Sequence, residues 1–342
     1  MIKLLNNPTF DNERNILNAD LFVNNLKNTL KAFNLHTKVT YNVYRNITIY
    51  NIIWNDDKTY NEVLEYRKEI SLSLGIRSEE LEVKKITDNE LEIIVPNMKR
   101  ESLVLKEILS DYKKDDTFKI ALGLDEKDNI VYYDFDKEKN LLVTGVSGTG
   151  KTNLFNNIIM NILINYIDTE VVILDSQGIN YNMYDSIYEV INNEDDIIER
   201  IKLLRKEFED RIKNDNNKKK IIFIDEIYEI LNKDLSVKDD LNYLLELSTS
   251  ANMFLVVSTD SVLEDDIYDL FKKDNISKLS FYLTTRGEYN LFMGEVVKES
   301  LNNDGVYLGQ NGKLMRLSIP LIQDGEIERV VNKRITMKNS EV

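Results

Sequence analysis

The sequence contains no cysteine and only one histidine, His36. The lack of cysteine excludes a disulfide framework, and with a single histidine it also excludes zinc and iron–sulfur sites built from Cys and His ligands. A Ser–His or Cys–His hydrolase is disfavoured for the same reason, and we expect His36 to be a surface or half-buried side chain. Any metal ion must then be a hard cation bound by oxygen, such as Mg2+.

Long apolar runs are missing as well. No stretch approaches the ~18 uninterrupted apolar residues of a membrane helix, and the best candidate, residues 158–167, is interrupted by Asn161 and Asn165. The N-terminal sequence has no signal-peptide core. We therefore expect a soluble, cytoplasmic protein without an intrinsic membrane segment, which a membrane or protein partner could still recruit.

Basic side chains are fewer than acidic ones, 44 against 59. The formal net charge is −15, and residues 101–342 carry all of it because basic and acidic side chains balance in residues 1–100. A protein that coats nucleic acid is normally basic, so this chain can bind DNA only through a local patch, such as the lining of a ring. The 342 residues, 42% of them hydrophobic, predict two globular domains, one of them large.

Residues 1–100 are predicted to form a small α+β domain. Helical spacing of apolar residues and runs of β-branched and aromatic residues indicate the elements. These are helices at 19–33 and 60–74, strands within 38–54 and a hairpin at 81–95. Gly75 is expected to end the second helix as a C-cap.

Residues 101–342 alternate short apolar runs with amphipathic helices. The expected strands are 141–143, 171–174, 221–224, 254–257 and 279–283. Unbroken apolar runs are typical of a mostly parallel sheet covered on both faces. One helix begins after Lys151, with asparagines at every fourth position from 153 to 165 along one stripe. Another begins near Asn193 with acidic residues in its first turn.

A complete phosphate-binding loop follows the first of these strands. Its residues are Gly145, Val146, Ser147, Gly148, Thr149, Gly150, Lys151 and Thr152. The glycines allow backbone N–H groups to turn toward the phosphates of ATP, and the following helix N-terminus adds partial positive charge. Lys151 is expected to reach the β and γ phosphates, and Thr152 to bind Mg2+ through its hydroxyl.

The second motif is an acidic pair, Asp225 and Glu226, after the apolar run 221–224. A buried strand brings both carboxylates to its C-terminal end, where ligands of open α/β sheets bind. We expect Asp225 to hold Mg2+ and Glu226 to orient or deprotonate the attacking water. Asp225 could instead cap the next helix, but Lys151 upstream favours the catalytic interpretation.

Four further features stay open at this level. Asp175 and Thr259 end two further predicted strands and could either sense the γ-phosphate or cap helices. Arg286 could complete the site of a neighbouring subunit as an arginine finger or lie on the surface. Lys218–Lys220 precede a strand, which places them at the edge opposite the nucleotide, so we expect a solvated loop rather than a DNA contact.

In this order the motifs resemble the FtsK/SpoIIIE DNA translocases, the FtsK/HerA branch of P-loop ATPases. The matching segments are a hairpin at 120–135, the phosphate loop, 174–178, 181–184, a helix at 206–211, Asp225-Glu226 and the strand end 258–262. Residues 72–75 and 93–97 resemble the family's α subdomain. The resemblance implies a RecA-like motor domain at 101–342, preceded by a small domain at 1–100.

Three features depart from the family pattern. Asp260 and Ser261 stand where the family has Gln and Arg, and only Arg286 keeps a positive charge in the segment that follows. The sequence shows no segment that resembles the family's membrane region or its winged helix, so we expect a stripped motor of the kind that mobile elements or phages carry.

The resemblance implies an ATP-hydrolysing homo-oligomeric ring, a hexamer in the family, that translocates double-stranded DNA. Two alternatives remain: an ATPase that moves a protein substrate, which the acidic motor half favours, and an assembly module switched by ATP.

Overall fold

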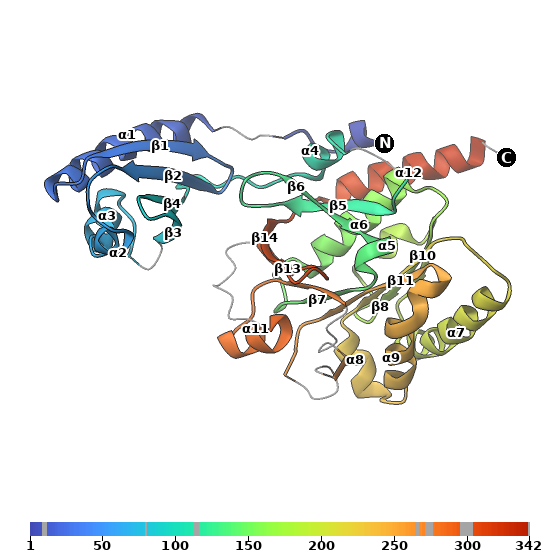
Figure 1. Ribbon diagram of the computed structural model, residues 1–342. Coiled ribbons are helices and arrows are strands. Elements are labelled where there is room, and N and C mark those ends of the chain that lie inside the picture. Colours follow the sequence, from blue (N-terminus) through green and yellow to red (C-terminus); the bar gives the residue numbers. More distant parts are fainter. Residues whose placement is uncertain are drawn as a thin grey trace. The chain divides into compact units, whose positions relative to one another are not determined.

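The computed structural model describes residues 1–8, 12–78, 81–112, 116–263, 267, 269–270, 276–294 and 304–340. The chain divides into two compact units (Figure 1). The larger contains residues 1–8, 103–125 and 129–342, and the smaller contains residues 9–102 and 126–128. No described helix is long and apolar enough to cross a membrane.

The smaller unit is a four-stranded antiparallel sheet, in the order β1-β2-β4-β3, packed against helices. Its elements are α1 (Glu13–Ala32), β1 (Thr37–Val43), β2 (Ile47–Trp54), α2 (Tyr60–Leu64), α3 (Arg67–Ser73), β3 (Glu82–Thr87) and β4 (Glu90–Pro96). The helix expected at 60–74 is thus two short helices. Gly75 has the positive φ of +66° that a C-cap requires, and the expected hairpin turns between β3 and β4.

The larger unit contains, within the described residues, one ten-stranded sheet in the order β6-β5-β14-β13-β12-β7-β11-β10-β8-β9. The strands are β5 (Lys119–Leu124), β6 (Ile130–Asp134), β7 (Leu141–Thr144), β8 (Glu170–Asp175), β9 (Glu189–Ile191), β10 (Lys220–Asp225), β11 (Met253–Thr259), β12 (Ser277–Ser280), β13 (Asp304–Leu308) and β14 (Leu314–Ser318). The six strands from β12 to β9 run parallel and the other four are antiparallel. The predicted mostly parallel sheet is therefore confirmed, although the run at 279–283 is a strand only as far as Ser280.

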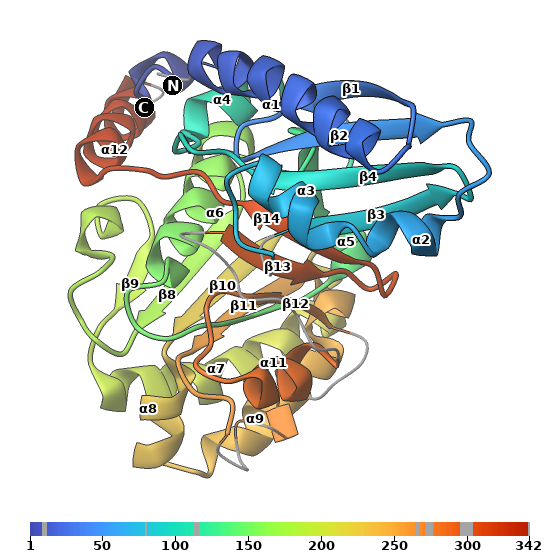
Figure 2. The ribbon, with the colours of Figure 1, turned by 90° about the vertical axis from the view of Figure 1, so that its left-hand side faces the viewer.

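Helices cover both faces of this sheet (Figures 1 and 2). They are α4 (Leu105–Ser110), α5 (Phe135–Glu138), α6 (Lys151–Asn165), α7 (Glu194–Lys213), α8 (Ile227–Lys233), α9 (Val237–Leu247), α11 (Arg286–Met293) and α12 (Asp324–Ser340). Ile221 and Phe223 of β10 join the apolar core that includes α6, whereas Ile222 and Ile224 join the core that includes α7 to α9. Alternate side chains of a strand point to opposite faces, so a continuous apolar run supplies both cores.

The asparagine stripe of α6 faces the protein: Asn157 and Asn161 are buried, and Asn153 and Asn165 are half-buried. Asn161 accepts a hydrogen bond from the Ala121 N–H (3.1 Å) and donates one to the Ala121 carbonyl (3.3 Å). A β-bulge lies beside Ala121 in β5, which leaves its peptide groups in need of partners. Asn153 and Asn157 both donate to the Pro320 carbonyl. The polar stripe thus attaches the helix after the phosphate loop to β5 and to residue 320.

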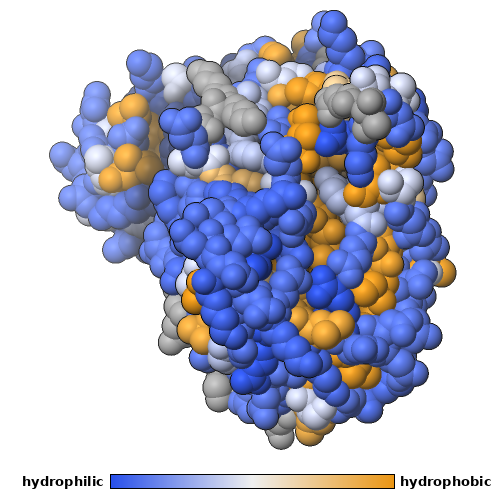
Figure 3. All heavy atoms as spheres, turned by 90° about the vertical axis from the view of Figure 1, so that its right-hand side faces the viewer, coloured by the Kyte–Doolittle hydropathy of each residue, from blue (hydrophilic) through white to orange (hydrophobic). Residues whose placement is uncertain are grey.

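The surface facing the viewer in Figure 3 is mostly hydrophilic, with apolar residues gathered in a band. His36 lies on the surface as expected, with 75% of its side chain exposed.

Candidate nucleotide-binding site

The phosphate loop spans residues 145–150 between β7 and α6. Its tip, Ser147 and Gly148, is exposed, while Val146 and Thr149 are half-buried. The Val146 N–H donates to the Tyr282 carbonyl (3.0 Å), so the segment after β12 supports the loop from outside. An exposed loop at the start of a helix of 15 residues leaves backbone N–H groups and a positive helix end accessible to an anion.

Gly145 and Gly150 are required by geometry. Their φ angles are +152° and +121°, which L side chains rarely adopt. A Cβ on Gly145 would lie 2.7 Å from the Phe281 Cβ, and one on Gly150 would lie 3.2 Å from the Phe281 ring. The loop therefore packs closely against the residue that follows β12, and only glycine permits this approach.

The acidic pair lies at the same edge of the sheet as the loop. β7, β11 and β10 are parallel neighbours, with Thr144 of β7 in register with Thr259 of β11. β11 therefore separates the strand of the phosphate loop from the strand that ends in Asp225. The Glu226 side chain spans the gap between these two strands, because its Oε1 lies 2.9 Å from the Lys151 Nζ.

Lys151 and Glu226 form a buried ion pair, with less than a tenth of each side chain exposed. Lys151 also donates to the Gly145 carbonyl (2.6 Å), and the other carboxylate oxygen of Glu226 accepts the Asp260 N–H (2.9 Å). Glu226 has the left-handed φ of +53°, a strained conformation for a residue with a side chain. The strain fits a functional position, because it directs the carboxylate into the phosphate site.

Burial raises the pKa of Glu226, although the ammonium of Lys151 acts in the opposite direction. Burial also raises the pKa of Asp225, despite hydrogen bonds donated by Ser258 and Tyr181. A carboxylate with a raised pKa is a better proton acceptor than one in water. This suits Glu226 to the role of a general base.

Two residues that sequence reasoning missed hold Asp225. The Ser258 hydroxyl donates to its Oδ1 (2.5 Å) and the Tyr181 hydroxyl to its Oδ2 (3.0 Å). Both side chains are fully buried. Both lie in segments that carry the family resemblance, 181–184 and 258–262, but the sequence did not reveal that they share Asp225 as a partner. Asp225 does not cap α8, whose first position has no side-chain cap.

Asp175 and Thr259 have local hydrogen-bond partners. The Asp175 carboxylate accepts the N–H groups of Gln177 (3.2 Å) and Asn180 (2.8 Å), so it caps the turn after β8. The Thr259 hydroxyl donates to the Ser261 carbonyl (2.9 Å). Both lie at the nucleotide edge of the sheet, and both organise the loops that follow their strands.

Arg286 is the exposed first residue of α11. The preceding Thr285 caps this helix: its hydroxyl accepts the Glu288 N–H (3.2 Å), and the Glu288 carboxylate accepts the Thr285 N–H (2.6 Å). The T-x-x-E spacing was a sequence signal for this capping box. A guanidinium gains nothing from the positive end of a helix, which leaves Arg286 available for other contacts.

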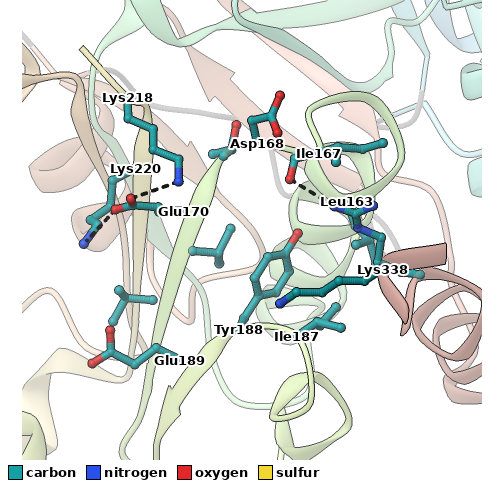
Figure 4. A pocket seen from close by; sticks show the side chains of 14 residues that line it. Leu163, Ile167, Asp168, Glu170, Ile187, Tyr188, Glu189, Lys218, Lys220 and Lys338 are labelled. Carbon is teal, nitrogen blue, oxygen red and sulfur yellow. Dashed lines mark hydrogen bonds and ion pairs between the residues drawn. The ribbon is translucent and has the colours of Figure 1, made fainter. Parts of the chain in front are cut away.

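The lysines at 218–220 lie at the opposite edge, as expected, but Lys220 does not belong to a solvated loop. It starts β10, is buried, and pairs with Glu207 and with Glu170 (3.1 Å). A cavity of about 510 Å3 opens beside it, between β8 and α12 (Figure 4). Glu170, which lines this cavity, also pairs with Lys218 (3.3 Å). The cavity contains no residue of the phosphate loop or of the acidic pair.

Three features together define a P-loop ATPase with a RecA-like fold. They are the parallel sheet, the glycine-rich phosphate loop and the ion pair between Lys151 and Glu226 at the edge of the sheet. Residues 105–222 match the FtsK/SpoIIIE family. The predicted resemblance to this family is thus confirmed over that segment, and the chain is a P-loop ATPase.

Similar proteins support this assignment. The chain is 22% identical to the DNA translocase FtsK of Staphylococcus aureus, over 90% of this chain and 44% of that protein. It is 24% identical to FtsK of Caldanaerobacter subterraneus, over 90% and 48% of the two chains. The chain therefore spans about half the length of the curated relatives it matches.

Two solved structures show the same fold. The pCW3 conjugation coupling protein TcpA, solved with ATPγS, has a TM-score of 0.63 and 13% identity, with 93% of this chain and 99% of that chain covered. The type VII secretion ATPase EccC of Thermomonospora curvata has a TM-score of 0.58 and 15% identity, with 68% and 34% covered.

Proposed function

We propose that this protein hydrolyses ATP and works as a homo-oligomeric ring, of six subunits as the family resemblance implies, that translocates double-stranded DNA. The contact between Lys151 and Glu226 carries the proposal, because it places the phosphate-binding lysine and the expected general base 2.9 Å apart. The proposed cargo and mode of action are inferred from the relatives named DNA translocase.

The residues at the sheet edge fit a nucleotide with its metal ion. Lys151 and the N–H groups of the loop offer charge and donors to phosphate oxygens. Thr152 and Asp225 offer oxygen ligands directly or through water, and Mg2+ in such sites takes few ligands from the protein. When bound, Mg2+ neutralises charge that develops on the phosphates. Lys151 must leave Glu226 to bind phosphate, and the released carboxylate is then free to accept a proton from water.

The DNA proposal is tested by an ATPase titration. Steady-state phosphate release is measured against linear double-stranded DNA at about 50 mM and about 200 mM salt, where phosphate contacts weaken steeply. Stimulation at low salt that fades at high salt is expected, with Lys151→Ala as the inactive control. Turnover that no form of DNA changes, at either salt concentration, rules out DNA as the cargo.

The ring proposal assigns Arg286 to the neighbouring subunit's site. Arg286 is exposed on the edge of the sheet that carries the nucleotide site. Removal of an arginine finger costs on the order of a thousandfold in rate. We expect Arg286→Ala and Glu226→Gln each to be inactive and their mixture to regain turnover, since mixed rings contain some intact sites. A mixture that stays inactive, or a protein that remains monomeric with ATPγS, argues against shared sites.

A protein cargo is the second candidate. It is favoured by the net charge of −15, which is concentrated on residues 101–342, and by a fold shared with a type VII secretion ATPase. The same titration distinguishes the two candidates, because a motor for acidic DNA loses stimulation with salt whereas a motor for a polypeptide does not depend on DNA at all.

A further inference from the structure

Asp225 is held from two sides by hydroxyl groups that come from distant parts of the chain. Tyr181 belongs to the crossover between β8 and β9, and Ser258 to the end of β11. Each donates to a different oxygen of the same carboxylate, at 3.0 Å and 2.5 Å respectively. A carboxylate oxygen accepts more than one hydrogen bond, so both oxygens keep a lone pair for a metal-bound water.

The Ser258 hydroxyl also contacts the second residue of the acidic pair. Its oxygen accepts the Glu226 N–H (3.0 Å), so one serine fixes the carboxylate of Asp225 and the backbone of Glu226 together.

Burial makes these contacts rigid. Tyr181 and Ser258 have no exposed surface, and Asp225 is 2% exposed. The Tyr181 ring packs near Phe155 of α6, with centroids 6.3 Å apart. A buried hydroxyl without a partner costs free energy, so neither group can turn away from the carboxylate without a penalty.

We infer that Tyr181 and Ser258 are positioning residues that orient Asp225 toward Mg2+. They act through the Asp225 carboxylate, to which both donate hydrogen bonds. This inference rests on the proposed function, since it requires that Asp225 serves a magnesium–nucleotide complex. Partners that orient metal ligands typically contribute about ten- to a hundredfold in metal affinity or activity.

The test compares Tyr181→Phe and Ser258→Ala with wild type. ATPγS binding is measured by calorimetry in EDTA and across a Mg2+ titration, and melting temperatures confirm that each variant is folded. We expect unchanged binding in EDTA but about a tenfold higher Mg2+ concentration for half-maximal tightening. The matched control is Tyr184→Phe, because Tyr184 lies on the same crossover but donates to Asn156 (3.0 Å) on α6.

The experiment distinguishes failure of the proposed metal site from failure of the positioning role of Tyr181 and Ser258. If wild-type protein binds ATPγS no better with Mg2+ than without, the assignment of Asp225 to a metal site is wrong. If wild type responds to Mg2+ and both variants respond equally, the ATPase proposal stands and the positioning role is refuted. An equal loss in Tyr184→Phe shows a general packing effect and also refutes it.

Discussion

Replacement of Glu226 by glutamine tests how the resting site is held. The Glu226 carboxylate contacts the Lys151 ammonium at 2.9 Å and the Asp260 N–H at 2.9 Å. Glutamine keeps the size and shape of the side chain but removes its charge. Lys151 then retains only neutral acceptors, including the Gly145 carbonyl at 2.6 Å.

The size of the effect follows from these contacts. A hydrogen bond to a charged group contributes about 1 kcal/mol more than one between neutral groups. ATP must displace this contact to reach Lys151, so its removal should tighten ATPγS binding by about fivefold to tenfold. Loss of a general base should lower the rate of hydrolysis by at least about a hundredfold. The variant should therefore bind more tightly and hydrolyse far more slowly.

The assay pairs calorimetric binding of ATPγS with steady-state phosphate release. Glu229→Gln is the control, because Glu229 is exposed on α8 only one turn further along the chain. It should match wild type in both measurements. Hydrolysis by the Glu226→Gln variant within about tenfold of wild type removes Glu226 from the role of general base. Weaker binding of ATPγS contradicts the competition for Lys151.

Three further predictions concern stability and the loop. Asn161→Leu removes the side-chain partner of the Ala121 N–H and carbonyl groups in β5. Urea unfolding should therefore show a free energy of unfolding lower by about 2–4 kcal/mol. A decrease below about 0.5 kcal/mol contradicts this account. Burial raises the pKa of Glu170, but the contacts with Lys220, Lys218 and Arg211 together lower this pKa by more, so the net shift is downward. The stabilisation is present above the unfolded-state pKa and is lost as pH falls through the folded-state pKa. Glu170→Gln should thus lower the free energy of unfolding by about 1 kcal/mol at neutral pH, after allowance for solvent screening. The difference from wild type should vanish in acid, and a difference that does not change with pH refutes the role of the charge. Gly145→Ala should abolish ATPγS binding, since its methyl would lie 2.7 Å from a phenylalanine, whereas Gly312→Ala, with no atom within 4 Å, should bind normally.

Local patterns in the sequence were enough to predict the phosphate loop, the acidic pair and the parallel strands around them. These features depend on contiguous residues: a glycine-rich turn before a helix, or four apolar residues before two carboxylates. The N-cap of α7 is another such case, since the Asn193 side chain accepts the N–H groups of Asp195 (3.0 Å) and Asp196 (3.3 Å). The strands β13 and β14 were missed because their short, mixed sequences carry no clear period.

The sequence by itself thus determined the chemistry: which groups could bind phosphate and metal, and that parallel strands carry them. Only the tertiary structure decided which groups meet. It inserted β11 between β7 and β10, brought Tyr181 and Ser258 onto Asp225, and buried Asn161 of α6 against β5. The physical reason is that the spacing of apolar side chains records which face of an element is covered, whereas strand order and hydrogen bonds between residues up to 44 positions apart depend on how the whole chain packs.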